Sequence, residues 1–366
     1  MSIDLIILLY LLTLLYCLLI LAFSVGIFLL SRKKDSKTKP ISVIIAARDE
    51  AENIDELINC LKVLDYPHDM FEVIVVDDRS SDATFQKLNI LQQQFDWLSC
   101  YKVEKENPQL VGKKGALALA IKHAKFEILA FTDADCRPNK NWLIEINAAM
   151  TDNTDFLCGY SPLIGKSSIV NKLKNLERVS IFAVIAGSFG LHWDLTSVAR
   201  NQVYRKSKFY EIDGFAGIGI HRSGDDDLLL QKMSPVLRKR NFMFSAAVPS
   251  FDKVSGKAMM DLETRRASKW RLYQLSIKLL TLLIFIYYIS LTVAFAAVLF
   301  SLLDWYDLLL IIFAKFLAEL ILIALFLAKI KQLKLLLYFP LAELLYVPYY
   351  LYFGIKGTFG KYKWKN

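Results

Sequence analysis

The sequence has few cysteines and histidines, and neither residue type is spaced for a zinc site. Its five cysteines are scattered, odd in number and free of any Cys-x-x-Cys pair, which also argues against a disulfide framework. The four histidines are isolated. No basic module with interleaved aromatic residues accompanies the net charge of +9, so no nucleic-acid partner is expected. Lysine and arginine beside apolar segments explain the charge better, because they would face anionic lipid head groups.

Long apolar runs occupy both ends of the chain, and 55% of all residues are hydrophobic. Residues 3–30 are almost wholly apolar, with Asp4 as their only charge, and they are long enough to span a bilayer. They lack a positive n-region and a clear cleavage site, which favours a signal anchor over a cleaved signal peptide. Residues 31–40 carry five positive charges, so the positive-inside rule places this flank in the cytoplasm.

The C-terminal third contains three further apolar segments. Residues 279–303 carry no charge, residues 308–327 contain Lys315 and Glu319, and residues 335–353 are interrupted by two prolines. Lys315 and Glu319 lie four apart on one helix face, where they can pair. We expect an internal ion pair that fixes helix packing, and the alternative is a polar lining for an acceptor path.

The basic end of the chain conflicts with a simple count of spans. A cytoplasmic central domain followed by three spans would place residues 356–366 outside, yet this tail is strongly basic and should stay inside. We therefore predict that residues 335–353 are re-entrant or interfacial. Another apolar stretch, within residues 172–193, is too short to span a membrane. It suits an interfacial helix, the wall of an acceptor site or an ordinary buried helix.

The central region alternates strand and helix patterns. Short apolar runs predict four strands, at residues 41–47, 71–77, 98–103 and 127–132. Helical stretches follow them, at residues 50–64, 82–94, 113–124 and 140–150. Repeated strand–helix units of this spacing predict an α/β fold with a mostly parallel sheet and helices on both faces.

Carboxylates cluster where the predicted strands end. Asp49 follows the first strand, Asp77 and Asp78 end the second, and Asp133 and Asp135 follow the fourth. Open α/β sheets bind ligands at this edge. Two carboxylates one residue apart suit Mg²⁺ or Mn²⁺ bound to a diphosphate, although Asp-x-Asp also arises by chance. The turn after Asp78 holds serine and aspartate residues that would also cap the next helix well.

Two further motifs carry charge. Lys113 stands between Gly112 and Gly115 at a predicted helix start, where an ammonium group can meet a phosphate or a base. Its neighbour Lys114 is expected to be solvated. Residues 224–227 place three adjacent aspartates after a glycine. Such acids repel one another, so one of them can have a raised pKa suited to accepting a proton. The alternative is a helix N-terminus that carries acids because of its dipole.

In this order and spacing, the motifs resemble those of the family 2 glycosyltransferases over residues 40–270. The apolar segments are laid out as in membrane-bound members such as ceramide glucosyltransferase and the hyaluronan, chitin and cellulose synthases. The resemblance implies a nucleotide-diphospho-sugar transferase fold, GT-A-like, plus transmembrane helices. It divides the chain into an N-terminal transmembrane anchor (1–31), a cytoplasmic glycosyltransferase domain (32–270) and a C-terminal membrane region (271–366).

The resemblance also implies roles for single residues. Asp226 would be the catalytic base. Asp135, with Asp133, would bind Mn²⁺ or Mg²⁺. Contacts to the nucleotide-sugar are implied for Asp49, Asp77, Asp78, Lys113, Asp133 and Asp225. The segment 201–205 resembles one that shapes the sugar pocket.

Residues 266–270 resemble a motif that closes over the diphosphate and the acceptor in membrane-bound members. Arg266, Lys269 and Trp270 would then contact the substrate. Lys269 stands where the family has arginine, and the two are not interchangeable in bidentate phosphate contacts. The alternative is a basic juxtamembrane cluster with an interfacial tryptophan.

The function implied is inverting transfer of a sugar from a nucleotide-diphospho-sugar, expected to be a UDP-sugar, to a hydroxyl of a membrane-associated lipid or lipid-linked glycan. The expected location is the bacterial inner membrane, with the catalytic domain in the cytoplasm. Alternatives are a processive polysaccharide synthase, a glycosyl-phosphoryl-lipid synthase and an inactive nucleotide-sugar-binding scaffold. Three C-terminal segments are few for a polysaccharide channel, and the intact acidic motifs weigh against the other two.

Overall fold

The computed structural model describes residues 3–31, 33–165, 168–251 and 256–360, which fall into two compact units. The unit that we call the sheet unit comprises Leu30–Lys166 and Ser188–Asp252. The helical unit comprises Met1–Leu29, Ser167–Gly187 and Lys253–Asn366. The segment 167–187 therefore groups with the apolar ends of the chain, although it lies in the middle of the sequence.

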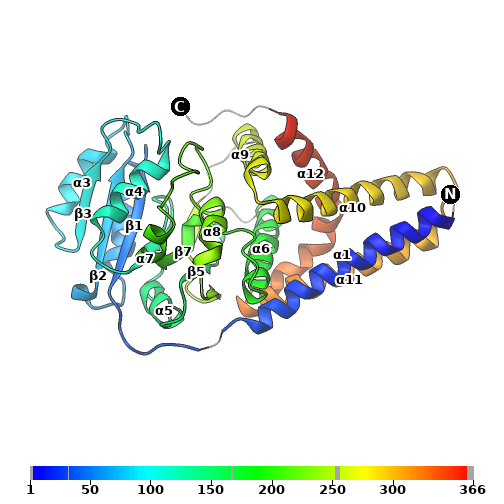
Figure 1. Cartoon of the computed structure of the whole chain (residues 1–366), viewed down its shortest axis with the longest axis horizontal. Coiled ribbons are helices and arrows are strands. Elements are labelled where there is room, and N and C mark those ends of the chain that lie inside the picture. The colour runs from blue at the N-terminus through cyan, green and yellow to red at the C-terminus, as the bar shows by residue number, and fades with distance from the viewer. Residues whose placement is uncertain (1–2, 32, 166–167, 252–255, 361–366) are drawn as a thin grey trace. The chain divides into compact units, whose positions relative to one another are not determined.

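A seven-stranded sheet forms the centre of the sheet unit (Figure 1). Its order is β3-β2-β1-β4-β7-β5-β8, and every pairing is parallel except the two that β7 makes. The prediction of a mostly parallel sheet is confirmed, and all four predicted strands are present. The strands of this sheet and of a separate β6–β9 pair are β1 (Ile41–Ala47), β2 (Phe71–Asp77), β3 (Leu98–Lys102), β4 (Ile128–Phe131), β5 (Phe156–Gly159), β6 (Leu163–Ile164), β7 (Gln202–Arg205), β8 (Arg240–Met243) and β9 (Ser250–Phe251).

Helices cover both faces of this sheet, as predicted. Val43 and Ile45 of β1 join a buried apolar cluster with Leu57 and Trp142 from the helices on one face. Ile44 points to the opposite face, because side chains alternate along a strand, and α4 packs against β1 and β2. The helices of this unit are α2 (Ile54–Lys62), η1 (His68–Met70), α3 (Thr84–Gln92), α4 (Lys113–His123), α5 (Trp142–Ala149), η2 (Ala199–Asn201), α7 (Lys206–Glu211), α8 (Asp227–Met233) and η3 (Ser234–Val236).

The register decides which residues meet at each edge of the sheet. β1, β2 and β4 are parallel, so the residues that follow them gather at one edge. β7 is antiparallel to β4 and pairs Gln202 with Phe131 and Arg205 with Ile128. The residues just before β7 therefore join that carboxyl edge, whereas Arg205 lies at the opposite edge.

Among its described residues, the helical unit contains four stretches that are long and apolar enough to cross a membrane, namely Ile6–Leu29, Leu275–Leu299, Trp305–Lys329 and Leu333–Thr358. This finding confirms the prediction of membrane helices. Leu333–Thr358 is the least apolar of them, its interfacial placement stays a prediction, and residues 361–366 of the basic tail lie outside the described residues. The helices are α1 (Ile3–Leu29), α6 (Ile169–Gly190), α9 (Gly256–Ser268), η4 (Lys269–Leu272), α10 (Leu275–Leu299), α11 (Trp305–Lys329), η5 (Leu333–Tyr338) and α12 (Phe339–Phe359).

A buried polar network links four of these helices. The predicted pair of Lys315 and Glu319 is confirmed at 2.9 Å, and Lys315 also lies 2.5 Å from Glu343 of α12. From α1, the Tyr16 hydroxyl donates to Glu319 and lies 2.9 Å from the Tyr288 hydroxyl of α10. The N-terminal helix is thus bonded into the same bundle as the C-terminal helices, with α1 and α11 side by side (Figure 1).

Replacing Lys315 by methionine is expected to destabilise this bundle. The substitution leaves the buried carboxylate of Glu319 and the half-buried carboxylate of Glu343 without their cation, and breaking a buried ion pair typically costs about 3 kcal/mol. Thermal unfolding of the detergent-solubilised chain measures the loss. The matched control is Lys329→Met, because Lys329 is exposed at the end of the same helix. Equal melting temperatures for the two variants would show that the network contributes no stability.

Candidate active site

Asp49 joins the two loops that follow β1 and β2. Its backbone N–H donates to the Ser80 hydroxyl (2.9 Å), and its Oδ1 accepts from the N–H (2.7 Å) and the hydroxyl (3.0 Å) of Ser81. Its φ of +54° lies in the left-handed region, which aspartate tolerates better than most residues. The side chain is 40% exposed, so a ligand at this edge can still reach the carboxylate.

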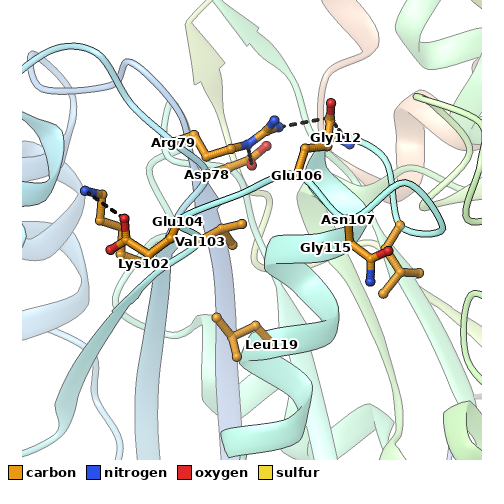
Figure 2. A pocket seen from close by; sticks show the side chains of 11 residues that line it. Asp78, Arg79, Lys102, Val103, Glu104, Glu106, Asn107, Gly112, Gly115 and Leu119 are labelled. Carbon is orange, nitrogen blue, oxygen red and sulfur yellow. Dashed lines mark hydrogen bonds and ion pairs between the residues drawn. The ribbon is translucent and has the colours of Figure 1, made fainter.

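Asp77 and Asp78 are both buried, but only Asp78 reaches a cavity. The Asp77 side chain is fully buried, and its Oδ2 accepts from the Ser80 N–H at 3.2 Å. Asp78 instead lines a cavity of about 270 Å³ between the end of β2, the loop after β3 and the start of α4 (Figure 2). The predicted capping role falls to Asp82, whose Oδ1 accepts from the N–H of Thr84 (2.9 Å), the first residue of α3. A ligand in the cavity would therefore meet Asp78.

Arg79 and Glu106 form a chain of charges along the wall of this cavity. Arg79 donates through Nε to Asp78 Oδ1 (2.9 Å) and through Nη2 to Glu106 Oε1 (3.1 Å). The same Glu106 oxygen accepts from the N–H of Gly112 at 3.0 Å. The Gly112 N–H and the Arg79 guanidinium hold the pKa of Glu106 below its usual value. This chain connects Asp78 to the start of α4.

Lys113 lies between two of the predicted acidic motifs. The preceding Gly112 has a φ of +67°, which suits glycine and turns the chain into α4. The Lys113 ammonium is hydrogen-bonded to Asp133 Oδ1 and lies 3.5 Å from Asp225 Oδ2. Burial lowers the pKa of Lys113, but the carboxylates of Asp133, Asp225 and Asp226 outweigh burial and raise it. The structure therefore brings together residues that are more than ninety positions apart in the chain.

Arg200 is a site residue that the sequence did not reveal. It lies in η2, just before β7, and its Nε is 3.6 Å from Asp133 Oδ2. Burial raises the pKa of Asp133, but the charges of Lys113 and Arg200 outweigh it, so the pKa is lowered. Only the antiparallel placement of β7 brings Arg200 to this edge, and that pairing has no local signal in the sequence.

Asp133, Asp135 and Cys136 provide donor atoms that could hold a divalent cation. One ligand atom from each residue lies within 4.8 Å of the other two. Burial, and then the charge of Asp133, raises the pKa of Asp135. A cation beside Asp135 would relieve this repulsion, and two carboxylates suit Mn²⁺ or Mg²⁺. The donor set therefore fits the predicted metal.

The three acids at residues 225–227 have different surroundings. Asp225 contacts Lys113, as described above. The Asp226 side chain is half-buried, and its Oδ1 accepts from the Asp227 N–H (2.8 Å) at the start of α8. Asp227 is buried, and its Oδ1 accepts from the Leu228 N–H at 2.8 Å. Asp227 is thus engaged in the first turn of α8, and the half-buried Asp226 caps the start of that helix, as the dipole alternative predicted, while its carboxylate lies near Lys113.

Lys114 is buried, so the prediction that it is a solvated neighbour of Lys113 is wrong. Its side chain is 1% exposed, and its ammonium donates to the carbonyl oxygens of His221 (2.5 Å) and Ser223 (2.7 Å). These two carbonyls lie in the segment that leads into Asp225. Lys114 therefore fixes the loop that carries the acids, while Lys113 contacts the acids themselves.

Arg266, Lys269 and Trp270 belong to the helical unit, so their contact with a substrate stays a prediction. Arg266 lies in α9, where its Nη1 is 2.7 Å from Glu263 Oε1 one turn earlier. Lys269 and Trp270 lie in the short helix η4 that leads to α10. Basic residues beside an apolar helix are expected for both interpretations, the motif that closes over the substrate and the juxtamembrane cluster.

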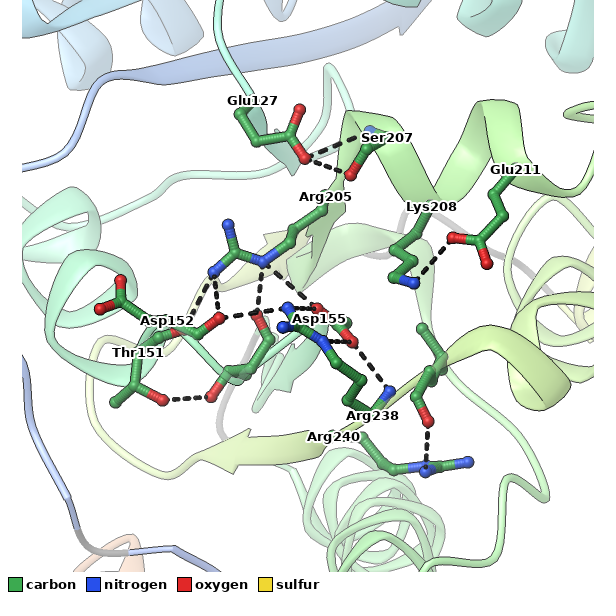
Figure 3. Close-up of polar contacts among 12 residues, drawn as sticks. Glu127, Thr151, Asp152, Asp155, Arg205, Ser207, Lys208, Glu211, Arg238 and Arg240 are labelled. Atoms are coloured by element: carbon green, nitrogen blue, oxygen red, sulfur yellow. Dashed lines mark hydrogen bonds and ion pairs between the residues drawn. The ribbon is translucent and has the colours of Figure 1, made fainter.

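The segment 201–205 is largely structural. Asn201 is buried, accepts from the Trp142 indole N–H (3.0 Å) and donates to the carbonyl of Tyr160 (3.1 Å). Arg205, at the other edge of the sheet, lies 3.3 Å from Asp155 (Figure 3). The fully buried Asp155 also accepts from the Arg238 guanidinium at 2.6 and 3.0 Å. The expectation that this segment shapes a sugar pocket therefore does not extend to Arg205.

Replacing Asp155 by asparagine is expected to destabilise the sheet unit by about 2 kcal/mol at pH 7, because two arginines lose an ionised partner. Burial raises the pKa of Asp155, but hydrogen bonds from Arg238 outweigh it and lower the pKa. The stabilisation is thus present above the ordinary carboxyl pKa of about 4 and is lost as the pH falls through the folded value. Melting temperatures of wild type and variant should converge on acidification.

The control for this prediction is Asp152→Asn, because Asp152 is exposed and only its backbone carbonyl accepts from the two arginines. It should melt like the wild type at every pH. A difference between wild type and Asp155→Asn that stayed constant with pH would contradict the assigned pKa direction.

Residues 42–218 match a family model described as glycosyl transferase family 2. A stretch of 103 residues is 36% identical to glycosyltransferase AglE of Haloferax volcanii, covering 28% of this chain and 33% of that protein. A stretch of 107 residues is 35% identical to a beta-monoglucosyldiacylglycerol synthase of Trichormus variabilis, covering 29% and 22%. The chain thus spans a third or less of the length of these relatives.

The fold is shared with the mannosyltransferase PcManGT from Pyrobaculum calidifontis, solved in complex with GDP-Man and Mn²⁺. The TM-score is 0.56 at 17% identity, over 97% of this chain and 98% of that chain. This likeness confirms the GT-A-like fold that the family resemblance implied. The match over residues 42–218 includes the ends of the strands that Asp49, Asp78 and Asp133 follow, so this part of the chain is similar to a glycosyl transferase family 2 domain.

Proposed function

We propose that this protein is a membrane-bound inverting glycosyltransferase that moves a sugar from a nucleotide-diphospho-sugar to an acceptor hydroxyl. The observation that carries the proposal is the cluster of Lys113, Asp133 and Asp225 at the carboxyl edge of the sheet, with Asp135 and Asp226 beside it. Ligands of open α/β sheets bind at that edge. One part of the cluster would bind the diphosphate of the donor, and the other part would supply the base.

The donor is proposed to bind with its base against Asp78 and its diphosphate against Lys113 and Arg200. A carboxylate accepts a base N–H, and the ammonium and guanidinium groups match the charge of a diphosphate. Asp49 would contact the nucleotide from the loop after β1, and the buried Asp77 would hold the turn that positions Asp78. A UDP-sugar is the donor that we propose.

Asp135 and Asp133 would hold a divalent cation, Mn²⁺ or Mg²⁺, with Asp135 as the direct ligand. When bound, such a cation neutralises negative charge on the departing diphosphate. Lys113 pairs with Asp133 in the described structure, so that ammonium is already positioned next to the charge that the diphosphate brings. Support for a metal comes from the donor set and not from any single distance.

Asp226 would act as the general base. Its carboxylate takes the proton of the acceptor hydroxyl while the acceptor oxygen forms a bond to the anomeric carbon. The bond from that carbon to the diphosphate oxygen breaks, and the nucleoside diphosphate leaves with the electron pair. A single displacement from an α-linked donor gives a β-linked product. Asp225 pairs with Lys113 and would orient the donor next to Asp226.

The acceptor is proposed to be a lipid or a lipid-linked glycan. Support comes from the four apolar helices found in the described part of the chain and from the relative named for synthesis of monoglucosyldiacylglycerol. Arg266, Lys269 and Trp270 would close over the substrate. The proposed layout is an anchor (1–31), a cytoplasmic catalytic domain (32–270) and a C-terminal membrane region (271–366) in a bacterial inner membrane.

A screen of nucleotide sugars against membranes that contain the protein tests the proposal. UDP-sugars, GDP-sugars and a buffer control are incubated with MnCl₂, and the lipid extract is analysed by mass spectrometry. We expect one UDP-sugar to add a single hexose or N-acetylhexosamine to a lipid. A ladder of products would favour a processive synthase, and a sugar-phosphate addition would favour a phosphoryl-lipid synthase. No product from any donor would favour an inactive scaffold.

A further inference from the structure

The carboxylate that would recognise the base is not a free carboxylate. Asp78 lines the cavity with only 7% of its side chain exposed, and Arg79 Nε occupies its Oδ1 at 2.9 Å. The Asp78 carboxylate and the Arg79 guanidinium therefore lie next to each other on the cavity wall, as Figure 2 shows. The inference drawn from this pair rests on the proposed function, because it concerns the base of the donor nucleotide.

Uracil and guanine, the bases of UDP and GDP, present different patterns of hydrogen-bond donors and acceptors to Asp78 and Arg79. Guanine presents two adjacent N–H donors, at N1 and N2, and both oxygens of one carboxylate are needed to accept them. Uracil presents a single donor, N3–H, flanked by two carbonyl acceptors. A carboxylate only accepts and a guanidinium only donates. An oxygen of Asp78 and an N–H of Arg79 therefore complement uracil, whereas guanine would have to share Oδ1 with the Arg79 Nε–H that already donates to it.

We propose that Arg79 determines the base specificity of the cavity and selects uracil over guanine. The fold itself does not decide this point, since the related PcManGT structure contains GDP-Man. In this chain, Arg79 adopts a left-handed φ of +59°, a conformation that costs energy and persists only where the surroundings impose it. Its side chain donates hydrogen bonds to Asp78 and Glu106, two carboxylates that line the cavity.

Glu106 keeps the arginine in this orientation. Its Oε1 accepts from Arg79 Nη2 (3.1 Å) and from the Gly112 N–H (3.0 Å), so it ties Arg79 to the residue before Lys113. Glu106 is a positioning residue, since it acts on the base through Arg79. Loss of Glu106 should weaken the preference for uracil less than loss of Arg79.

Binding of UDP and GDP to the full-length, detergent-solubilised chain in MnCl₂ tests the proposal by calorimetry. Wild type should bind UDP more tightly than GDP. Arg79→Gln should weaken UDP binding about tenfold, which is the effect of losing one charge-assisted hydrogen bond. GDP should bind to this variant as tightly as to wild type or more tightly. Arg79→Lys keeps the charge without the guanidinium geometry, so its affinity for UDP should lie between those of wild type and Arg79→Gln. Lys87→Gln, which removes an exposed ion pair with Asp55 on the same unit, is the control and should bind like wild type.

Two results would overturn the inference and leave the proposed function standing: wild type binding GDP as tightly as UDP, or folded Arg79 variants that keep the wild-type ratio of affinities. Melting curves of the variants establish that they are folded. If wild type bound neither nucleotide, the proposed function would fail and the role of Arg79 would fail with it.

Discussion

Replacing Asp226 by asparagine is expected to lower the rate of sugar transfer by a factor of about 10² to 10⁴, the usual contribution of a general base. Asparagine keeps the shape of the side chain, and its amide oxygen can still accept the Asp227 N–H. It cannot take a proton from the acceptor hydroxyl. Initial rates of transfer into lipid extract, at matched expression, measure the loss.

Nucleotide binding separates this loss of chemistry from a loss of structure. Asp226→Asn should bind UDP as tightly as wild type, because Asp226 is assigned to the acceptor and not to the donor. The matched control is Asp227→Asn, since Asp227 is buried in the first turn of α8 and should retain most of the transfer rate. Near-wild-type transfer by a normally expressed Asp226→Asn variant would refute the assignment.

Removal of the metal ligand Asp135 is expected to have the second large effect. Loss of a residue next to a metal ligand typically costs 10-fold to 100-fold, so loss of the direct ligand should lower transfer by more than about 100-fold. Wild-type transfer should likewise stop when EDTA is added and return with excess MnCl₂. The free Mn²⁺ signal in electron paramagnetic resonance reports binding independently of activity.

Asp135→Asn should recover little when MnCl₂ is added, and it should bind less Mn²⁺ than wild type. Asp152→Asn provides the control, because Asp152 is an exposed acid on the same unit whose side chain has no assigned role. Transfer that continued unchanged in EDTA would contradict the assigned metal, although it would leave Asp226 as the proposed base.

The first half of the sheet could be predicted because its strands are buried apolar runs that end in polar turns. Once β1, β2 and β4 are parallel, Asp49, Asp78 and Asp133 must meet at one edge. The strands β5, β7 and β8 are each four residues long and pair with distant partners. Their order, and with it the position of Arg200, depends on tertiary packing that no local pattern encodes.

The two neighbouring lysines show the same limit at the level of single side chains. Adjacent residues on a helix point in different directions, so only one of Lys113 and Lys114 can face the acids. The local sequence does not show which one. The carbonyls that bind Lys114 come from a loop more than a hundred residues away. In the helical unit, the spacing of Lys315 and Glu319 revealed their pairing, but no spacing in the sequence indicates that Glu343 of α12 joins them.

The configuration of the product tests the central claim most directly, because it reports on the displacement at the anomeric carbon itself. Membranes with the wild-type protein are incubated with an α-linked UDP-sugar labelled with ¹³C at the anomeric carbon, and the lipid product is examined by NMR. The proposed single displacement with Asp226 as base predicts a β-linked product that is missing with Asp226→Asn. An α-linked product, or a β-linked product formed equally by that variant, would contradict it.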